Sequence, residues 1–318
     1  MVAYRRDFLL LTSAAIVLSL FSRVAQAQAY PTRPIHFVAP FPAGPNDALA
    51  RPSGKKLSRR GRYAPWRDGD HRGRGRCAGA SRWLHASIYR GPPDHHGTGA
   101  PQAQLRWQRD LIPIAAVVKS DNVLVMHPAT KIHSMAELVA EAKAKPGALT
   151  FASAGHASPA HMCGEMIKRQ ADIDMVHVPY TSATAAMNAV LAGNVNMFCG
   201  PIGVALPQVK AGNVYALGVT GVEASPLLPG ITPLAASYPG LVISAWYGLF
   251  APSGTPDSVT NILHDEFKKI FAEPEVQPTL LALGLTREWV SGSDLVQKIA
   301  SDSAKWRDFT AAANIHAE

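Results

Sequence analysis

The chain has 318 residues, enough for one large or two medium domains with a substantial core. Its formal net charge of +8 would ordinarily indicate an acidic partner such as nucleic acid. That charge is local, because residues 51–109 contain 12 Arg and 2 Lys against 3 Asp, whereas the remaining residues contain 17 basic and 20 acidic side chains. The body of the protein is mildly acidic, which argues against a nucleic-acid-binding surface over most of its length.

The first residues have the pattern of a signal peptide. Paired arginines at positions 5 and 6 precede an apolar stretch over 8–21, and an Ala-Gln-Ala cleavage motif follows at 25–27. As a helix, this apolar stretch would span only about 21 Å, which is short of the roughly 30 Å hydrocarbon core of a membrane. We predict export to the periplasm with cleavage after Ala27, and the paired arginines fit the twin-arginine route for folded chains.

Two contrasting stretches follow the predicted cleavage site. Residues 34–41 are an apolar run, residues 42–46 are turn formers, and Asp47 opens an Ala/Leu stretch. This order predicts a buried strand, a tight loop and the start of a helix. Residues 51–109, in contrast, contain no Val, Phe, Glu, Met or Asn, and they have no feature of a packed core.

From Asp110 onward, strand and helix patterns alternate. Two apolar strand-like runs flank residues 119–122, and Ser134 caps a helix that is closed by Pro146 and Gly147. The remaining expected elements are a strand, loop and helix over 149–170, a second such unit with its helix at 183–191, buried strands over 215–221 and 243–256, and helical stretches near 256–283 and 293–313. The alternation predicts an α/β fold with parallel sheets.

Three predicted strand-to-helix junctions carry small polar loops, with the sequences PFPAGPND, SAGHASPAH and VPYTSATAA. In open α/β sheets, ligands bind at the carboxyl ends of strands, where helix N-termini offer N–H groups to anions. Such loops suit carboxylates, and they lack the glycine spacing of phosphate or dinucleotide loops. The candidate ligand-binding residues are Phe41, Ala43, Gly44, Asn46, Asp47, Ser153, Gly155, His156, Ser158, His161, Tyr180, Thr181 and Ser182.

Some of these residues also fit purely structural roles. Gly44 fits a turn glycine, Asp47 fits a helix N-cap, and His161 fits a histidine that supports its own loop. The Ser/His content of the second loop invites a hydrolase interpretation, but there is no G-x-S-x-G motif and no clear acidic third member. We therefore predict no catalytic residues, no cofactor and no metal ligands. Trp246 and Tyr247 fit core packing at least as well as ligand stacking.

The cysteines at positions 77, 163 and 199 match no zinc or thioredoxin spacing. Export permits a disulfide between Cys163 and Cys199. Because free cysteines are among the most buried residue types, two buried free thiols are the preferred prediction.

The stretches YPTRPIHFVAPFPAG, NVLVMHP, LTFASAGHASPAHMCGEMIK, DMVHVPYTSATAAMNAVLAGNVNMF, YALGVTG and WYGLFAPSGTP resemble the Bug-type solute receptors of tripartite tricarboxylate transporters. The resemblance covers the signal peptide, residues 30–50 and residues 110–318. It implies a type II periplasmic binding protein, in which two α/β lobes are joined by crossing strands and a ligand cleft lies between them. Lobe 1 would comprise 28–125 and 247–318, and lobe 2 would comprise 126–246.

The resemblance also implies a function. A receptor of this kind is a monomer that captures a small carboxylated solute and passes it to membrane permease subunits, without performing chemistry on it. The chain departs from the family pattern in two places. Pro45 stands where a second glycine is usual, which removes one potential backbone donor to the ligand. Cys199 and Gly200 replace an acidic residue, which puts amine recognition there in doubt.

Residues 51–109 lack the family's RPGA-type loop and DGYTLL-type strand. Codons exist for residues 82–87 that spell Asp-Gly-Tyr-Thr-Leu when they are read one base later, and codons for residues 64–81 allow the family's loop and helix in the same way. We interpret 58–109 as family sequence translated in the wrong frame, which would not build the family's second strand and helix. The alternative is a genuine basic, disordered insertion.

Four functions remain for comparison with the structure. The leading hypothesis is a periplasmic solute receptor, and the second is a damaged, non-binding member of the same family. A nucleic-acid-binding protein that uses residues 51–109 is opposed by export and by the absence of interleaved aromatic repeats. A Ser/His hydrolase is opposed by the missing nucleophile motif.

Overall fold

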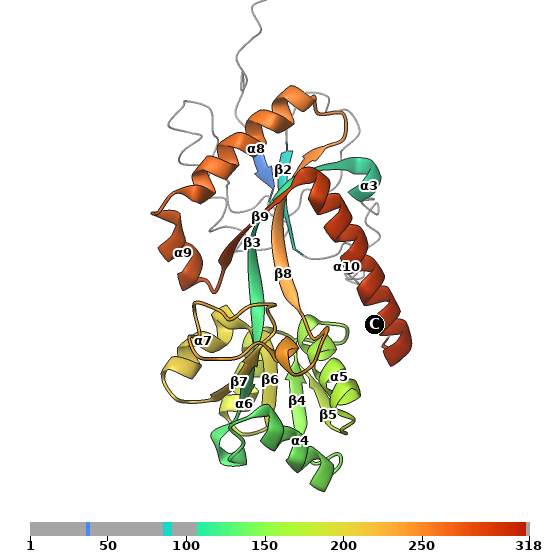
Figure 1. The fold of residues 1–318 in the computed structure, drawn as a ribbon, viewed down its shortest axis with the longest axis vertical. Helices are drawn as coiled ribbons and strands as arrows, with labels where there is room; N and C mark the ends of the chain where they lie inside the picture. Colours follow the sequence, from blue (N-terminus) through green and yellow to red (C-terminus); the bar gives the residue numbers. More distant parts are fainter. Residues whose placement is uncertain (1–35, 39–84, 91–106, 316–318) are drawn as a thin grey trace, which may run out of the picture. The chain divides into compact units, whose positions relative to one another are not determined.

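The computed structural model describes residues 36–38, 85–90 and 107–315 (Figure 1). Its strands are β1 (His36–Val38), β2 (His85–Arg90), β3 (Leu111–Met126), β4 (Thr150–Ser153), β5 (Val176–Pro179), β6 (Met197–Pro201), β7 (Tyr215–Val219), β8 (Ser244–Pro252) and β9 (Thr286–Ser291). Its α-helices are α3 (Trp107–Asp110), α4 (Met135–Ala144), α5 (Pro159–Ala171), α6 (Ala183–Leu191), α7 (Ile202–Lys210), α8 (Asp257–Ala272), α9 (Val276–Ala282) and α10 (Gly292–Ala313). Two short 3-10 turns are η3 (Pro128–Thr130) and η4 (Leu234–Ala236). The predicted mixture of strands and helices is confirmed.

Strand β3 belongs to two groups of strands. Its first part, up to Asp121, pairs antiparallel with β8 and β9, whereas Asn122–Met126 pairs antiparallel with β6 and β7. Figure 1 shows β3 and β8 running side by side between these groups. β3 is therefore a crossing strand, and its change of partners lies close to the lobe boundary predicted at residue 125, which stays a prediction.

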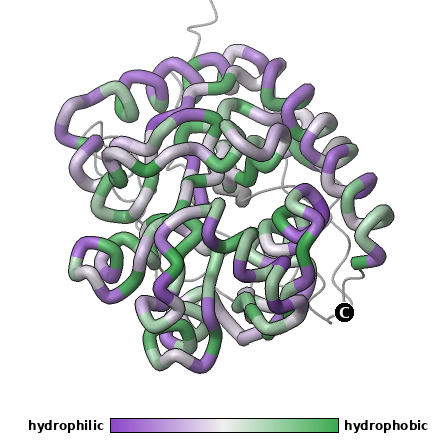
Figure 2. Tube along the Cα trace, turned by 60° about the horizontal axis from the view of Figure 1, so that its bottom comes forward, coloured by the Kyte–Doolittle hydropathy of each residue, from purple (hydrophilic) through white to green (hydrophobic). Residues whose placement is uncertain are grey.

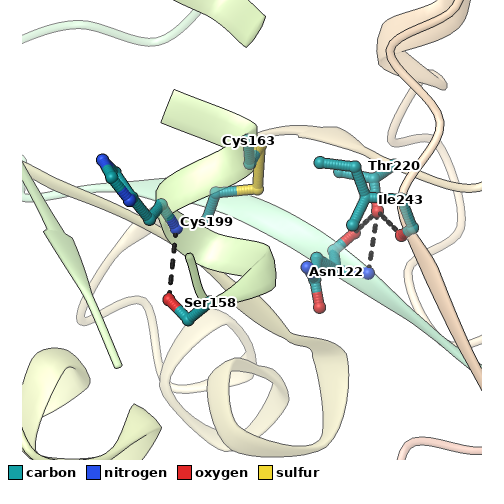
Figure 3. Close-up of a disulfide and its surroundings, with 7 residues drawn as sticks. Asn122, Ser158, Cys163, Cys199, Thr220 and Ile243 are labelled. Carbon is teal, nitrogen blue, oxygen red and sulfur yellow. Dashed lines mark hydrogen bonds between the residues drawn. A yellow bond between two sulfur atoms is a disulfide. The ribbon is translucent and has the colours of Figure 1, made fainter. Parts of the chain in front are cut away.

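The prediction of two separate runs around residues 119–122 is wrong, because β3 is continuous through them. Ser120, Asp121 and Asn122 are buried there within the continuous strand. The Asn122 backbone N–H donates to Thr220 Oγ1 at 2.9 Å, and the same hydroxyl donates to the Ile243 carbonyl at 2.6 Å (Figure 3). The Ser244 hydroxyl donates to the Asp121 carboxylate. These bonds satisfy buried polar groups at the place where the sequence pattern indicated a break between two apolar runs.

The second group of strands has the predicted parallel core. β4 pairs in parallel with both β5 and β6, and each of the three strands is followed by a helix, namely α5, α6 or α7. Because parallel strands place their carboxyl ends at one edge, the three following helices begin at that same edge. The helix predicted over residues 183–191 has those bounds in the structure.

Both faces of this sheet are buried. On β3, Leu124 and Met126 pack into one hydrophobic cluster with Phe151, while Val123 and Val125 pack into another. This alternation is the period of two expected for a strand, with apolar residues on both faces because helices cover both. In Figure 2 hydrophilic and hydrophobic stretches alternate along the helices, as expected when each helix buries one face.

The C-terminal region corrects two expectations. The helical stretch expected near 256–283 is divided into α8 and α9, with Pro274 in the break, because proline cannot donate the backbone bond that a continuous helix requires. Strand β9 was not predicted. Trp246 and Tyr247 on β8 are buried, and the Trp246 indole N–H donates to Asp302 at 3.1 Å, so Trp246 is a core residue.

The structure describes one strand within the basic segment. Residues 58–109 are predicted not to build the family's second strand and helix; β2 supplies a strand there, which pairs in parallel with β1 and antiparallel with β8. The helix of that unit would fall outside the described residues, so the prediction for the unit as a whole stays a prediction. A strand ladder is formed by backbone groups, and β2 includes Ile88 and Tyr89, which favour extended structure. The rest of the segment up to residue 106, like the predicted signal peptide, lies outside the described residues.

Among the helices that the structure describes, none is both long and apolar enough to cross a membrane.

Candidate functional site

The second and third predicted loops lie next to each other. Loop 154–158 connects β4 to α5, and loop 180–182 connects β5 to α6. Ser153 is paired with Pro179 in the sheet register, and the Tyr180 amide donates to the Ser153 carbonyl at 2.9 Å. The first loop, with candidates Phe41, Ala43, Gly44, Asn46 and Asp47, lies outside the described residues.

Serine side chains cap the two helices that follow these loops. Ser158 Oγ accepts from the His161 amide at 3.4 Å at the start of α5, and Ser182 Oγ accepts from the Ala185 amide at 3.1 Å at the start of α6. These are the residue types that satisfy the first amides of a helix. The first turns of both helices are thereby held in place at the loop edge of the sheet.

The charge of the helix N-termini differs from helix to helix. Glu137, Asp257 and Asp294 lie in the first turns of α4, α8 and α10, where a carboxylate offsets the positive end of the helix dipole. The first turns of α5, α6 and α7 contain no acidic residue. At the carboxyl edge of β4, β5 and β6, the positive helix ends are therefore left for an external anion.

Ser153, the last residue of β4, holds the second loop through hydrogen bonds to Gly155. Its side chain is fully buried, and its hydroxyl donates to the Gly155 carbonyl at 2.9 Å and accepts from the Gly155 amide at 3.1 Å. Gly155 has a φ of +109°, a conformation that is essentially restricted to glycine. Both residues therefore shape the loop from within it.

The remaining candidates differ in exposure. His156, Thr181 and Ser182 are exposed, Ser158 and Tyr180 are half-buried, and His161 is buried. Of the candidates from the two loops, the three exposed residues have the side chains most accessible to a ligand.

Sequence reasoning missed His177. It lies on β5, and its Nε2 is 2.6 Å from Ser153 Oγ. Its ring stacks on that of His161, with 3.9 Å between centroids and 10° between planes. A histidine in the strand directly before a candidate loop is a usable signal, but the contact depends on the register between β4 and β5, which the sequence alone does not reveal.

Burial shapes the electrostatics of the stacked pair. It lowers the pKa of His161, and it lowers the pKa of His177 from 6.5 to about 4. The neighbouring imidazoles and Lys168 contribute to this lowered pKa of His177 after burial, the largest cause, while Glu165 raises the pKa of His161. At pH 7 both rings are therefore neutral.

This lowered pKa predicts an acid-sensitive fold. The unfolded chain protonates His177 near pH 6.5 and the folded chain only near pH 4, so acidification between these values favours unfolding. After allowance for partial exposure, the loss by pH 4 is about 1–2 kcal/mol. Denaturant unfolding at pH 7 and pH 4.5 measures it. A His177→Gln variant should lose less stability over this range than the wild type or a His264→Gln control, and equal losses in all three proteins would refute the assignment.

The prediction of free thiols at positions 163 and 199 is wrong. Cys163 on α5 and Cys199 on β6 form a disulfide, with their Cα atoms 6.2 Å apart (Figure 3). Both residues are buried, and α5 packs against β6 in such a way that the two side chains meet. Cys spacing does not reveal this proximity. The disulfide links α5 to the sheet. The second loop leads directly into the N-terminus of this helix.

Comparisons with known proteins place this arrangement in a family. Residues 95–315 match the model of the tripartite tricarboxylate transporter family receptor. A UPF0065 protein of Pseudomonas sp. strain P51 is 30% identical over 312 residues, covering 92% of this chain and 91% of that protein. BugT of Bordetella pertussis is 26% identical over 293 residues, covering 88% of this chain and 89% of BugT.

Solved structures show the same fold. An R. palustris protein with adipate is similar at a TM-score of 0.70, with 20% identity over 90% of this chain and 99% of that one. MatC from Rhodopseudomonas palustris, with bound malate, is similar at a TM-score of 0.63, with 21% identity over 88% of this chain and 99% of MatC. BugD, a periplasmic binding protein, is similar at a TM-score of 0.69, with 22% identity over 90% of this chain and 99% of BugD. The fold is that of a two-lobe type II periplasmic binding protein.

The chain belongs to the tripartite tricarboxylate transporter receptor family, which includes the Bug-type receptors. Members of this family are solute-binding receptors and not enzymes, so the hydrolase hypothesis is set aside.

Proposed function

We propose that this protein is an exported receptor that captures a small carboxylated solute and delivers it to the membrane permease subunits of a tripartite transporter. The observation that carries the proposal is the set of helix N-termini at the edge of β4, β5 and β6, whose first turns contain no acidic residue. An anionic carboxylate complements these positive helix ends and the backbone amides of the loops. The relatives solved with adipate and malate support the same ligand class.

Export is part of this proposal. Removal of residues 1–27 follows from the signal pattern, and the twin-arginine route follows from the paired arginines. The mass of the protein recovered from periplasmic extract tests the cleavage, since an intact N-terminus would contradict it.

A Thr181→Asp variant tests the anion site. Thr181 is exposed just before the N-cap of α6, so a carboxylate there would occupy the positive end of the helix dipole without disturbing the core. We expect the affinity for a dicarboxylate such as adipate to fall by at least about tenfold, which corresponds to about 1.4 kcal/mol. Calorimetric titration measures this affinity.

The control variant introduces the same negative charge at the N-terminus of a different helix. Ser293→Asp places a carboxylate in the first turn of α10, which already contains Asp294. This variant should bind as the wild type does, and thermal melts should show both variants folded. If the two variants bind equally well, loop 180–182 does not contact the ligand.

The second candidate is a damaged receptor that folds in part but binds poorly. The observation that favours it is the arginine-rich composition of residues 51–109, which replaces the RPGA-type and DGYTLL-type sequences usual in the family. Comparing the carboxylate affinity of the chain as written with that of a frame-restored version separates this candidate from the first, because a damaged receptor gains affinity when the frame is restored.

A further inference from the structure

Three histidines converge at the edge of the sheet from separate elements. His156 lies in the loop before α5, His161 lies in the first turn of α5, and His177 lies on β5. One ring nitrogen from each lies within 4.8 Å of the other two. The His156 ring stands edge-on to the stacked pair, with centroids 5.5 Å from His161 and 5.2 Å from His177. Such a group offers three nitrogen ligands to one ion.

Protonation favours coordination by the two less exposed rings. A metal binds the neutral imidazole, and burial holds His161 and His177 in that form at pH 7 by lowering the pKa of each. Lys168, a cation that lowers the pKa of both histidines, is paired with Glu165 at 3.1 Å. The local charge is therefore partly balanced before an ion arrives.

The contact with Ser153 orients the His177 ring. The single hydroxyl proton of Ser153 is directed at the Gly155 carbonyl, at 2.9 Å, so the 2.6 Å contact to His177 is satisfied when Nε2 carries the proton and donates it. The lone pair of His177 then lies on Nδ1. Metal-binding histidines commonly have their other N–H held by a protein acceptor in this way.

His161 needs a change of partner to bind a metal. Its Nδ1 accepts from the Ala157 amide at 3.1 Å, and a neutral imidazole has a single lone pair. Ala157 has a φ of +55°, which is unfavourable for a residue other than glycine. The loop conformation that holds this lone pair is therefore a strained one, and an ion that takes the lone pair would release the amide and the loop.

The stacked rings must also turn. Parallel rings 3.9 Å apart direct their lone pairs along parallel lines, whereas a tetrahedral ion requires both to point at one centre about 2.0–2.1 Å from each nitrogen. His156 is exposed, which gives an entry path from solvent to the cluster. Metal binding should therefore change the conformation of loop 154–158.

We propose that His156, His161 and His177 bind a divalent transition-metal ion of the Zn²⁺ class, with the fourth position open to water or an anion. Imidazole ligands favour Zn²⁺, Cu²⁺ and Ni²⁺ over the oxygen-seeking Mg²⁺ and Ca²⁺. Three protein ligands and one open position form a typical accessible zinc site. The site does not depend on the proposed capture of carboxylates, because it rests on the histidine geometry alone.

The test is a Zn²⁺ titration of the metal-free full chain by calorimetry at pH 7, in a buffer free of carboxylates and other chelators. We expect one site of defined stoichiometry that His156→Ala and His177→Ala each weaken by at least about tenfold. His133→Ala, an exposed histidine outside the cluster, is the matched control and should leave this site unchanged. All other histidines of the chain remain in every variant, so their background binding stays constant.

Replacing the buried His161 could disturb the fold, so His156→Ala, at an exposed position, is the decisive variant. Melting curves without metal verify that each variant is folded. Co²⁺ in place of Zn²⁺ adds a second readout, since its visible absorption bands report tetrahedral nitrogen coordination. Mg²⁺ should give no binding heat at this site. The proposal is overturned if the wild type binds no stoichiometric Zn²⁺, or if His156→Ala and His177→Ala bind Zn²⁺ as tightly as His133→Ala.

Discussion

Reduction of the Cys163–Cys199 disulfide is expected to lower the free energy of unfolding by about 3–4 kcal/mol. The bond closes a loop over a sequence separation of 36 residues, and a cross-link of this span removes much of the conformational freedom of the unfolded chain. The loss is a large part of the stability of a typical domain. Denaturant unfolding of oxidised and reduced protein measures the difference directly.

The matched control is the double variant Cys163→Ala, Cys199→Ala. Its unfolding should not respond to reductant, and because Cys77 remains in it, any contribution from that thiol would become visible. Since the second loop ends at Ser158, the N-cap of α5, ligand binding should weaken on reduction as well. Equal stability of the oxidised and reduced wild type would contradict the disulfide's role.

Restoring the shifted frame over residues 58–109 is expected to raise both solubility and ligand affinity, with a stability gain of several kcal/mol. As written, residues 51–109 supply only Leu57, Leu84, Ile88 and Leu105 as branched aliphatic residues. A strand that pairs in parallel and is covered on both faces normally requires a nearly continuous apolar run. β2 forms in the chain as written, so the gain should come from packing around it.

The two versions are compared by soluble yield, by thermal melting and by carboxylate titration. Hydrogen exchange adds local detail over residues 58–109. If the chain as written melts cooperatively, protects the amides of this segment and binds as tightly as the restored version, the frameshift interpretation fails and the basic segment is a genuine part of the fold. The nucleotide sequence of the gene provides an independent check.

Local pattern was sufficient for much of the fold. The helix at 183–191, the cap at Ser134 and the loops after β4 and β5 were predicted, because each depends on hydrophobic period and on residues close in sequence. The parallel pairing of β4 with β5 and β6 followed from the alternation of strands and helices. The prediction of parallel sheets is wrong for β3, which pairs antiparallel with β6, β7, β8 and β9. Features governed by short-range rules were therefore accessible before the structure.

Features that depend on long-range register were not accessible. The sequence of Ser120, Asp121 and Asn122 suggests a polar break between strands, but β3 continues through these residues. Ser244 donates to the Asp121 carboxylate, and the Asn122 backbone N–H donates to Thr220. The nearness of Cys163 to Cys199 and of His177 to Ser153 likewise arises from the packing of α5 on β6 and from the register of β4 and β5. No spacing rule in a single sequence encodes such contacts.

Calorimetric titration with a panel of mono-, di- and tricarboxylates, on the chain as written and on the frame-restored version, tests the central claim most directly. The account predicts saturable binding of at least one carboxylate with one site per chain, tighter in the restored version and weakened at least about tenfold by Thr181→Asp in either. Absence of binding for every carboxylate in both versions, with both proteins folded, would contradict a carboxylate receptor.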